Sequence, residues 1–479
     1  KALIPLLPSA MDNWKRFATN LLTHRNPYTG LTWAEDPALA TLSLVNEDNL
    51  PSWMNNDPDI KALFDARFEG FIASQPEAER SGPARDQARW QWLWRMQAAA
   101  YVTMREHVVA LGVTAPTTGA NMQNDLWTTA LRDGFDFVDN HAYHDHPRFP
   151  QQKWRLPYGF HQRSAVAELL RVPTALAHTR RLDRPFTVSE LNYCLPNHHR
   201  AEYAAGVPAV AGLQDWAGVW RFAFAGDIKQ ITGDPPADGF DLSRDPIAQL
   251  GDRAMALLYR RGDVAAAPWA VALGYRAEDA ARWREVSPNH AYLALALHAR
   301  TGVLPASELA AGRWPADLRC VVELDQAGAV EASGLPVLPC DERLPQTLAA
   351  SGLIKAEDFD LAKRRVRSAD GQVVCDAAAG RLTVVGSRSV AAVLPGGDEA
   401  PVAVGAVTLV NRDRDPATVV VAALEAGGLD TSKRILVLHL TDAQNGKIRF
   451  ADRKHTLVEH WGASPMLIRA GAVGVRLPG

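Results

Sequence analysis

The segment LATLSLVNEDNL, residues 39–50, is mostly apolar as far as Val45 and then turns polar at Asn46 and Glu47. An apolar run without clean alternation is typical of a parallel strand that is covered on both faces. Its polar end can be read in two ways: strand ends commonly meet water, or Glu47 is a proton donor at the edge of a sheet where catalytic side chains gather. We expect a buried parallel strand that ends at Glu47.

Strand and helix patterns alternate through the first half of the chain. Such alternation indicates parallel βα units, and in a βα barrel the carboxyl ends of the strands all face one mouth. The first four predicted strands end in polar residues: Asn46 and Glu47, Asn121, Asn140 and His141, and Glu190. Strands are predicted at 39–50, 113–121, 135–147, 184–197 and 217–227, and helices at 11–22, 57–74, 88–112, 125–133, 199–216 and 245–262.

After about residue 265 the pattern changes to short Val-, Ala- and Leu-rich runs separated by Gly, Asp and Pro. Runs at this spacing favour antiparallel sandwich modules. They include RCVVELD (319–325), GRLTVVG (380–386), ATVVVAALE (417–425) and KRILVLHLTD (433–442). We therefore expect a partial barrel domain over 1–265, a linker and β-rich accessory region over 266–365, and a β-sandwich domain over 366–479.

Composition sets limits on partners and chemistry. The net charge of −3 implies neither a polyanion nor a membrane surface as partner, and the basic residues form no run suited to nucleic acid. Glycine-rich nucleotide loops and a serine-hydrolase elbow are absent from the sequence. The four Cys are widely spaced, so no zinc ribbon or redox motif is indicated. The 14 Trp are enough for sugar stacking, although Trp also fills large cores.

Glu47 and Glu190 are a candidate catalytic pair. A retaining glycosidase needs two carboxyl groups about 5–5.5 Å apart, one as proton donor and one as nucleophile. Glu47 lies in LVNED and Glu190 in TVSELNY, each at the polar end of an apolar strand, with two predicted strands between them. If Glu47 ends barrel strand 4, Glu190 ends strand 7, and their carboxylates can flank one bond. The competing structural roles are a helix N-terminal carboxylate for Glu47 and a salt-bridged strand end for Glu190.

LVNED and TVSELN resemble the acid/base and nucleophile motifs of the clan of retaining βα-barrel glycoside hydrolases, which includes the cellulase, β-mannanase and β-galactosidase families. The resemblance spans about residues 11–262. It implies a (β/α)8 TIM-barrel catalytic domain followed by all-β sandwich-like domains. It also implies a β-glycosidase that acts on an oligo- or polysaccharide, needs no cofactor, and is secreted or periplasmic.

Carried over residue by residue, the resemblance implies roles at the site. Glu47 would be the general acid/base, with a pKa raised by the neighbouring carboxylate, and Glu190 the nucleophile. Asn46 would hydrogen-bond the sugar 2-hydroxyl, and either Tyr143 or His141 would orient the nucleophile. The remaining substrate-binding candidates are Asn121 and a stacking aromatic, Trp220 or Phe224.

Barrel strands 1–3 are not found before Glu47. Only 46 residues precede it, with one predicted helix, whereas a barrel uses about 30 residues per βα unit. An open half-barrel would expose strand edges and apolar faces to water, which is costly. We expect about 90 further residues, on the same gene product or on a second polypeptide, to close the barrel.

Two other interpretations stay open. His141, His144, Asp145 and His146 in HAYHDH are residue types that bind zinc, which would make the protein a metal-dependent barrel hydrolase. Alternatively, the chain is a non-catalytic carbohydrate-binding protein on a decayed barrel. The configuration and linkage of the sugar depend on loop shapes that the sequence does not predict.

Overall fold

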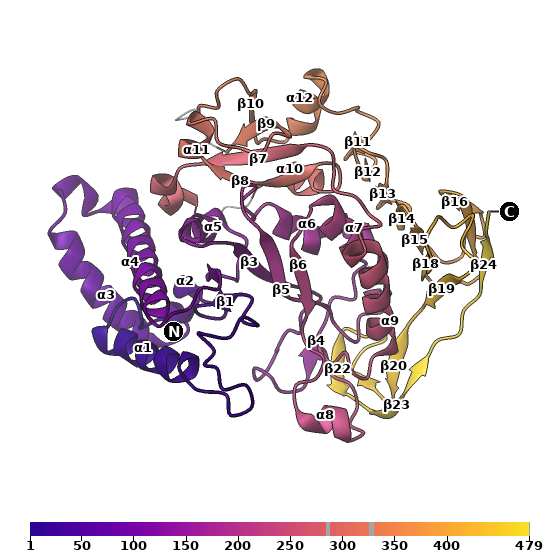
Figure 1. Ribbon diagram of the computed structural model, residues 1–479, viewed down its shortest axis with the longest axis horizontal. Coiled ribbons are helices and arrows are strands. Elements are labelled where there is room, and N and C mark those ends of the chain that lie inside the picture. Colours follow the sequence, from indigo (N-terminus) through magenta and orange to yellow (C-terminus); the bar gives the residue numbers. More distant parts are fainter. Residues whose placement is uncertain (284–287, 325–329, 479) are drawn as a thin grey trace.

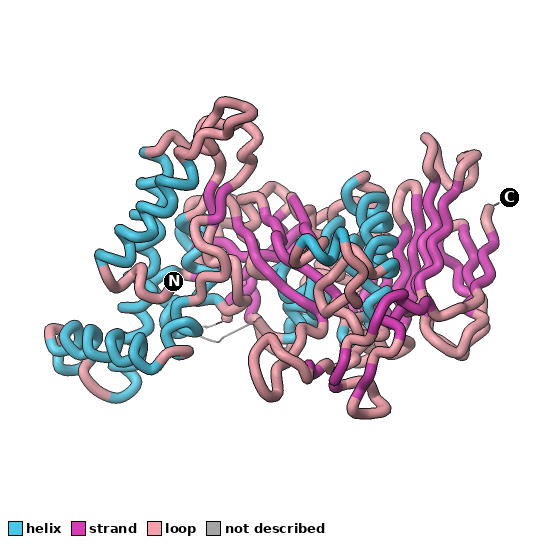
Figure 2. Tube along the Cα trace, turned by 90° about the horizontal axis from the view of Figure 1, so that it is seen from below, coloured by secondary structure: helices cyan, strands magenta, loops and turns pink. Residues whose placement is uncertain are grey.

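The computed structural model describes residues 1–283, 288–324 and 330–478. Helices dominate the N-terminal side of the molecule, parallel strands lie at its centre, and the C-terminal side is almost all strand (Figures 1 and 2). None of the helices in the described part of the chain combines the length and apolar character that a membrane span requires. The predicted helices are present as α1 (Pro8–Leu22), α3 (Pro58–Ala73), α4 (Gly82–Ala110), α5 (Leu126–Leu131), α7 (Tyr203–Leu213) and α9 (Pro246–Met255).

Two small parallel sheets follow one another in chain order. Strand β1 (Leu42–Ser43) pairs with β2 (Thr117–Thr118), and β3 (Val138–His144) pairs with β5 (Phe186–Tyr193), which pairs with β6 (Gly218–Arg221). The Asp136 N–H donates to the Thr117 carbonyl at 3.1 Å and joins the two sheets. Parallel βα order is therefore present. Over the described residues, however, these strands do not close into a barrel.

The first predicted strands are much shorter than expected. The ladder of β1 extends to the Leu44 N–H, which donates to the Thr118 carbonyl at 2.9 Å. The backbone then turns at Glu47, whose φ is 49°, and helix α2 (Leu50–Asn55) begins three residues later. An apolar run that ends in a left-handed residue cannot continue as a strand.

A second parallel α/β unit corrects the expectation for the region after 265. Strands β7 (Ala270–Tyr275), β8 (Arg300–Pro305), β9 (Leu318–Glu323) and β10 (Val337–Pro339) form one parallel sheet in the order β10-β9-β7-β8. The prediction of an antiparallel module at 319–325 was therefore wrong for residues 319–324, the part of this run that the structure describes. Helices α10 (His290–Leu295), α11 (Ala306–Ala310) and α12 (Leu344–Ala350) alternate with these strands, and their short length hid the βα pattern.

The C-terminal region is an extensive β structure, as expected. A seven-stranded antiparallel sheet is faced by a three-stranded sheet through a shared apolar core that includes Val390, Leu409 and Val419. On the other face, Ala391 and Val393 belong to the main core, where the sheet contacts α7. The larger sheet comprises β11 (Phe359–Asp360), β12 (Arg365–Arg367), β13 (Val373–Asp376), β14 (Arg381–Val385), β15 (Ser389–Leu394), β18 (Ala417–Ala423) and β19 (Ile435–Leu440); the smaller comprises β16 (Val402–Val404), β17 (Val407–Asn411) and β24 (Val473–Arg476).

The last part of the chain returns to the central strands. Strand β4 (Tyr158–Gly159), in the loop after β3, pairs with β22 (Leu457–His460), which pairs with β21 (Arg449–Phe450). Strands β20 (Ala443–Gly446) and β23 (Ala463–Ile468) form a neighbouring hairpin-like pair. Residues about 300 positions apart in the sequence therefore share one small sheet beside the carboxyl end of β3 (Figure 1).

Candidate functional site

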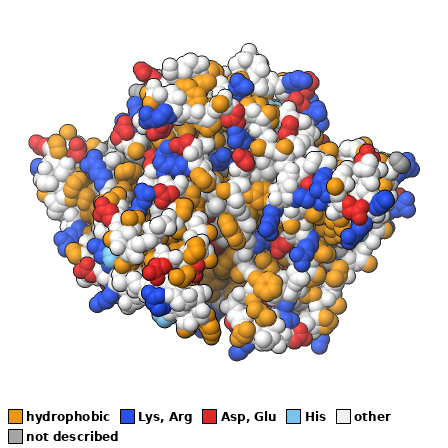
Figure 3. All heavy atoms as spheres, in the orientation of Figure 1, with side chains coloured by type: hydrophobic (Ala, Val, Ile, Leu, Met, Phe, Trp, Pro, Cys, Tyr) orange, Lys and Arg blue, Asp and Glu red, His pale blue; other side chains and the backbone are white. Residues whose placement is uncertain are grey.

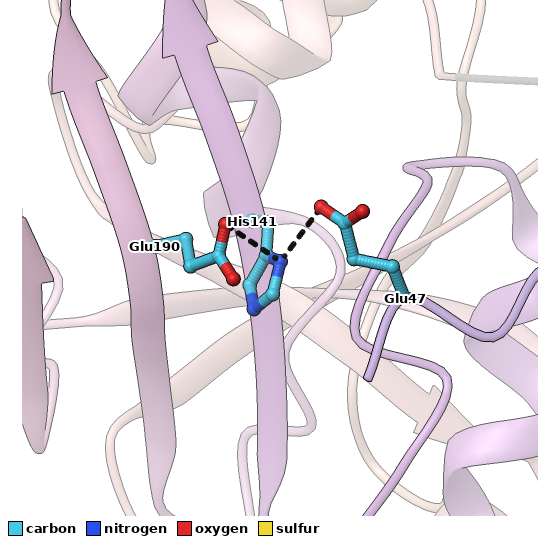
Figure 4. Close-up of side chains that lie close together, drawn as sticks. All are labelled: Glu47, His141 and Glu190. Atoms are coloured by element: carbon cyan, nitrogen blue, oxygen red, sulfur yellow. Dashed lines mark hydrogen bonds and ion pairs between the residues drawn. The ribbon is translucent and has the colours of Figure 1, made fainter. Parts of the chain in front are cut away.

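Glu47 and Glu190 meet at one site, on either side of His141 (Figure 4). Nδ1 of His141 lies 3.1 Å from a carboxylate oxygen of Glu47 and 3.6 Å from one of Glu190. One carboxylate oxygen of each glutamate and one ring nitrogen of His141 all lie within 4.8 Å of one another. The His141 side chain is 3% exposed, whereas those of Glu47 and Glu190 are 30% and 18% exposed. The carboxylates therefore face solvent over a buried imidazole.

The backbone of Glu47 is held in an uncommon conformation. Its φ of 49° lies in the left-handed region, which costs a non-glycine residue on the order of 1–3 kcal/mol. The Glu47 N–H donates to the Asn121 side-chain carbonyl at 2.7 Å, and the indole N–H of Trp53 donates to the Glu47 carbonyl at 2.8 Å. Since its carboxylate contacts His141, Glu47 does not act as a helix N-terminal carboxylate.

A buried polar group fixes the residue after Glu47. The Tyr101 hydroxyl, from α4, donates to the Asp48 carboxylate at 3.1 Å, and the Gln97 amide donates to that hydroxyl at 2.8 Å. Burial raises the pKa of Asp48. Helix α4 thus anchors the turn that carries Glu47.

Asn121 lies beside both Glu47 and His141, as the sequence predicted for a polar strand end. Its amide nitrogen is 3.1 Å from Nε2 of His141 and 3.5 Å from the side-chain oxygen of Asn46. With Nε2 in contact with Asn121, the His141 ring turns Nδ1 toward the two carboxylates. Arg132, fully buried, donates to the carbonyls of Ala120 and Gln123 and so holds the Asn121 loop.

A second set of polar residues lies behind His141, and the sequence analysis missed it. Ser189 Oγ is 2.9 Å from Nε2 of His141 and donates to the Asp139 carboxylate. Thr187 Oγ1 also donates to Asp139, at 2.7 Å. The period-two spacing of Thr187 and Ser189 on one strand is a signal that could have found them.

Glu190 has two contacts from β3, one from each of the two candidates for orienting it. The Tyr143 hydroxyl donates to one carboxylate oxygen of Glu190, and His141 faces the same oxygen. Burial, with the hydrogen bond to Glu190, raises the pKa of Tyr143, so its hydroxyl stays a donor. The Tyr143 ring contacts Phe222 and Phe240, which fix its position.

The pKa of Glu47 differs from the expectation. The hydrogen bond from His141 lowers it, and this outweighs burial, which acts in the opposite direction. The positive charges of His141, Lys1 and His146 lower it further. Prediction of a raised Glu47 pKa was therefore wrong for the free protein, because the imidazole between the carboxylates was not foreseen.

The two aromatic candidates for sugar stacking are both exposed. Trp220 extends from β6, next to the strand that carries Glu190, and Phe224 follows it and lines a cavity of about 370 Å³. A Cβ added at Gly218 would lie 2.5 Å from the Trp220 ring, so this glycine makes room for the indole.

The histidine-rich segment does not form the predicted metal cluster. Nε2 of His144 bonds the Arg163 carbonyl, and Nδ1 of His146 bonds the Pro147 carbonyl. Asp145 accepts hydrogen bonds from the backbone of His161 and from Asn197. Each residue has its own partner and they do not converge on His141.

Metal-ligating atoms do gather elsewhere. Among the described residues, Glu47, His141 and Glu190 are the group whose ligand-type atoms lie close enough to hold an ion. Two carboxylates and an imidazole are ordinary ligands for a divalent transition metal. The arrangement offers three ligand atoms to a dication, and an ion held there would compete with any chemistry that needs both carboxylates free.

Comparisons with known proteins leave the family open. No protein-family model and no curated protein matches the chain. A solved structure, apo exo-carrageenase GH42 from Bacteroides ovatus, aligns with a TM-score of 0.36 and 9% identity over 77% of this chain. The chain spans about 58% of that protein's length. A likeness at this level supports no conclusion about fold or activity.

Proposed function

We propose that this chain carries the catalytic site of a retaining glycoside hydrolase that cleaves β-linked glycans. The observation that carries the proposal is the pair formed by Glu47 and Glu190, with facing oxygens no more than 4.8 Å apart. Retaining enzymes need about 5–5.5 Å between the two carboxyl groups, whereas inverting enzymes need about 6.5–9.5 Å to admit a water molecule. An oxygen pair this close lies nearer to the retaining range than to the inverting range, which favours the double-displacement reaction.

In the first step, Glu190 attacks the anomeric carbon. A bond forms between that carbon and a Glu190 oxygen, the bond to the leaving oxygen breaks, and protonated Glu47 gives its proton to that oxygen. The Tyr143 hydroxyl keeps the Glu190 carboxylate oriented by donating to one oxygen. In the second step, Glu47 takes a proton from water, the water oxygen attacks the same carbon, and Glu190 leaves.

The remaining predicted residues have supporting positions. Asn46 is exposed next to Glu47, where its amide can reach a sugar hydroxyl, and Trp220 offers an exposed indole face on the neighbouring strand. We assign Asn46 and Trp220 to substrate binding. Asn121 is buried and supports the site by holding the Glu47 backbone and the His141 ring. His141 has the further role of hydrogen-bonding Glu47 until substrate enters.

We also propose that further βα units complete a TIM barrel around this site. Among the described strands, β1 pairs with β2 alone and β6 with β5 alone, which leaves two parallel edges that a barrel would pair. The units can belong to the same polypeptide or to a second one. Native mass spectrometry of active material tests this: a single species of 52.2 kDa with full activity would contradict it.

Kinetics of two variants test the proposed function. With a panel of aryl β-glycosides, Glu190→Gln should lose about four orders of magnitude in kcat, as removal of a nucleophile does in other enzymes. Glu47→Gln should lose about 10²–10⁴-fold on poor leaving groups and much less on activated ones, which leave without a proton. Glu425→Gln, at an exposed carboxylate, is the matched control. Sugar binding without turnover in the unsubstituted protein would favour a carbohydrate-binding protein instead.

A further inference from the structure

Two basic segments lie together beside the site. Residues 146–163 contain four Lys and Arg and no Asp or Glu, and residues 447–455 contain four Lys and Arg and a single Asp. The whole chain is nearly balanced, with 51 basic and 54 acidic residues, so this concentration is local. The cations are Arg148, Lys153, Arg155, Arg163, Lys447, Arg449, Arg453 and Lys454, and all are exposed.

The fold brings these segments together across about 300 residues of sequence. Pairing of β4 with β22 aligns Gly159 with Leu457. The Phe160 N–H donates to the Thr456 carbonyl at 2.7 Å, and the Gln162 amide donates to the His455 carbonyl at 2.9 Å. The strand pairing and these two hydrogen bonds hold the two segments in a fixed relation.

A cavity of about 750 Å³ lies where the segments meet, and Arg148, Phe149, Arg453 and Lys454 are among its lining residues. Within the described chain, none of these three cations has a carboxylate within 4.0 Å. The carboxylate of Asp452, also in the lining, accepts from the backbone of Lys454 and Thr456 inside its own turn. The cavity lining therefore holds three cations against one carboxylate and carries a net positive charge.

A line of rings connects this cavity with the catalytic pair. Tyr143, which donates to Glu190, contacts His146 at 5.4 Å between ring centroids, and His146 contacts Phe149 at 6.2 Å. The Trp154 ring contacts the rings of both His146 and Phe149, and Trp154 is 53% exposed. Exposed aromatic faces suit sugar rings, and the hollowed lower centre of Figure 3 shows many hydrophobic side chains.

We infer that the basic cavity formed by residues 146–163 and 447–457 binds the acidic groups, carboxylate or sulfate, of an anionic glycan whose scissile bond lies between Glu47 and Glu190. This inference rests on the proposed function. Unpaired cations attract such groups, and Arg binds them bidentately. A glycan is favoured over other polyanions because contacting rings, from Phe149 in the cavity lining through His146 to Tyr143, link the cavity with the catalytic pair.

Binding measurements on the Glu190→Gln protein test the inference without turnover. Oligosaccharides of equal length are titrated calorimetrically: one bearing carboxylates, one bearing sulfates and one neutral, each at low and high salt. At low salt at least one anionic ligand should bind about tenfold more tightly than the neutral one, and raising the salt should remove the difference. The carboxylate and sulfate arms show which acidic group the cavity prefers.

A double substitution, Arg453→Ser with Lys454→Ser, locates the binding. It should lower the affinity for the anionic ligand about tenfold and leave the affinity for the neutral ligand unchanged. Lys433→Ser with Arg434→Ser, at an exposed Lys-Arg pair before β19, is the matched control and should change neither. Equal binding of neutral and anionic sugars, or equal effects of the two double variants, would overturn the inference.

Two further outcomes separate the alternatives. Duplex DNA or anionic vesicles that bind as tightly as the anionic glycan would overturn the inference in favour of a general polyanion surface. Tight binding of the anionic glycan by Glu190→Gln, with no turnover of any glycoside by the unsubstituted protein, would defeat the proposed function and leave the binding site standing.

Discussion

At the scale of residues, the site is controlled by an imidazole between two carboxylates. The Nδ1–H of His141 stabilises ionised Glu47, so Glu47 holds its proton only at a pH below the ordinary range for glutamate, about 4.3. A general acid must be protonated when the leaving group departs. The proposed reaction should therefore lose rate as pH rises through this lowered pKa.

His141→Asn should move that loss of rate to higher pH. Removing the hydrogen bond and the charge of His141 lets the pKa of Glu47 rise, so the alkaline limb of kcat/KM shifts upward. The profile is measured on an aryl glycoside with a poor leaving group. A glycoside with an activated leaving group, which needs no proton, is the control. Its kcat/KM should fall little at alkaline pH in either protein. If the alkaline limb of kcat/KM does not move in His141→Asn, Glu47 is not the general acid.

Residue types and spacing predicted which side chains lie together at the candidate site but not its electrostatics. Glu47, Glu190, Asn121, His141 and Tyr143 were each predicted and do lie together. The direction of the Glu47 pKa could not be predicted, because it depends on which side of the carboxylate the imidazole occupies. The buried Asp139 and Ser189 contacts depend on strand register, which a β-bulge at Asn140 and His141 shifts.

At the scale of elements, helix and strand patterns located the βα units up to residue 262 and failed in the second parallel sheet. The strands of that sheet, β7 to β10, are three to six residues long, and the intervening helices α10 and α11 have six and five residues. Patterns this short do not distinguish a parallel from an antiparallel strand. The pairing of β4 with β22 could not be predicted from the sequence pattern either, since the two strands are far apart in sequence.

Gly218→Ala tests how β6 presents Trp220. The new methyl group would meet the indole 2.5 Å away, and the exposed ring must swing aside. If Trp220 stacks on substrate, KM should rise several-fold, with kcat nearly unchanged. Trp220→Ala should raise KM to a similar extent. An unchanged KM in both variants would show that Trp220 does not bind substrate. Thermal melting of each variant checks that the fold is intact.

At the scale of the whole molecule, one buried arginine joins the central helices to the C-terminal β region. Arg200 bonds Asp245, at the start of α9, at 2.7 Å, and Asp442, just after β19, at 2.5 Å. Arg200→Met would remove the cation that bonds both carboxylates and should cost about 3–5 kcal/mol of unfolding free energy. Arg381→Met, at a part-exposed pair with Asp398, should cost about 1 kcal/mol or less. Equal costs in urea unfolding would contradict the assigned role.

Acidification should destabilise the protein. Burial lowers the pKa of His178 to about 4, so between about 6.5 and 4 the unfolded chain takes up a proton that the folded chain does not. Asp442 acts in the same direction: burial would raise its pKa, but His198 and Arg200 lower it, and that stabilisation is lost as pH falls. The melting temperature should fall steadily below pH 6.5. His178→Gln should flatten the upper part of this fall, and an unchanged slope would contradict the assignment.

The central claim is that Glu190 forms a covalent bond with the sugar while Glu47 assists. A 2-deoxy-2-fluoro aryl glycoside slows the second step and accumulates the intermediate, so intact-mass spectrometry and peptide mapping test the claim directly. The account predicts one added fluoroglycosyl group, on Glu190, and none on the Glu190→Gln protein. A protein that turns over glycosides yet gains no mass, or carries the label on another residue, would contradict it.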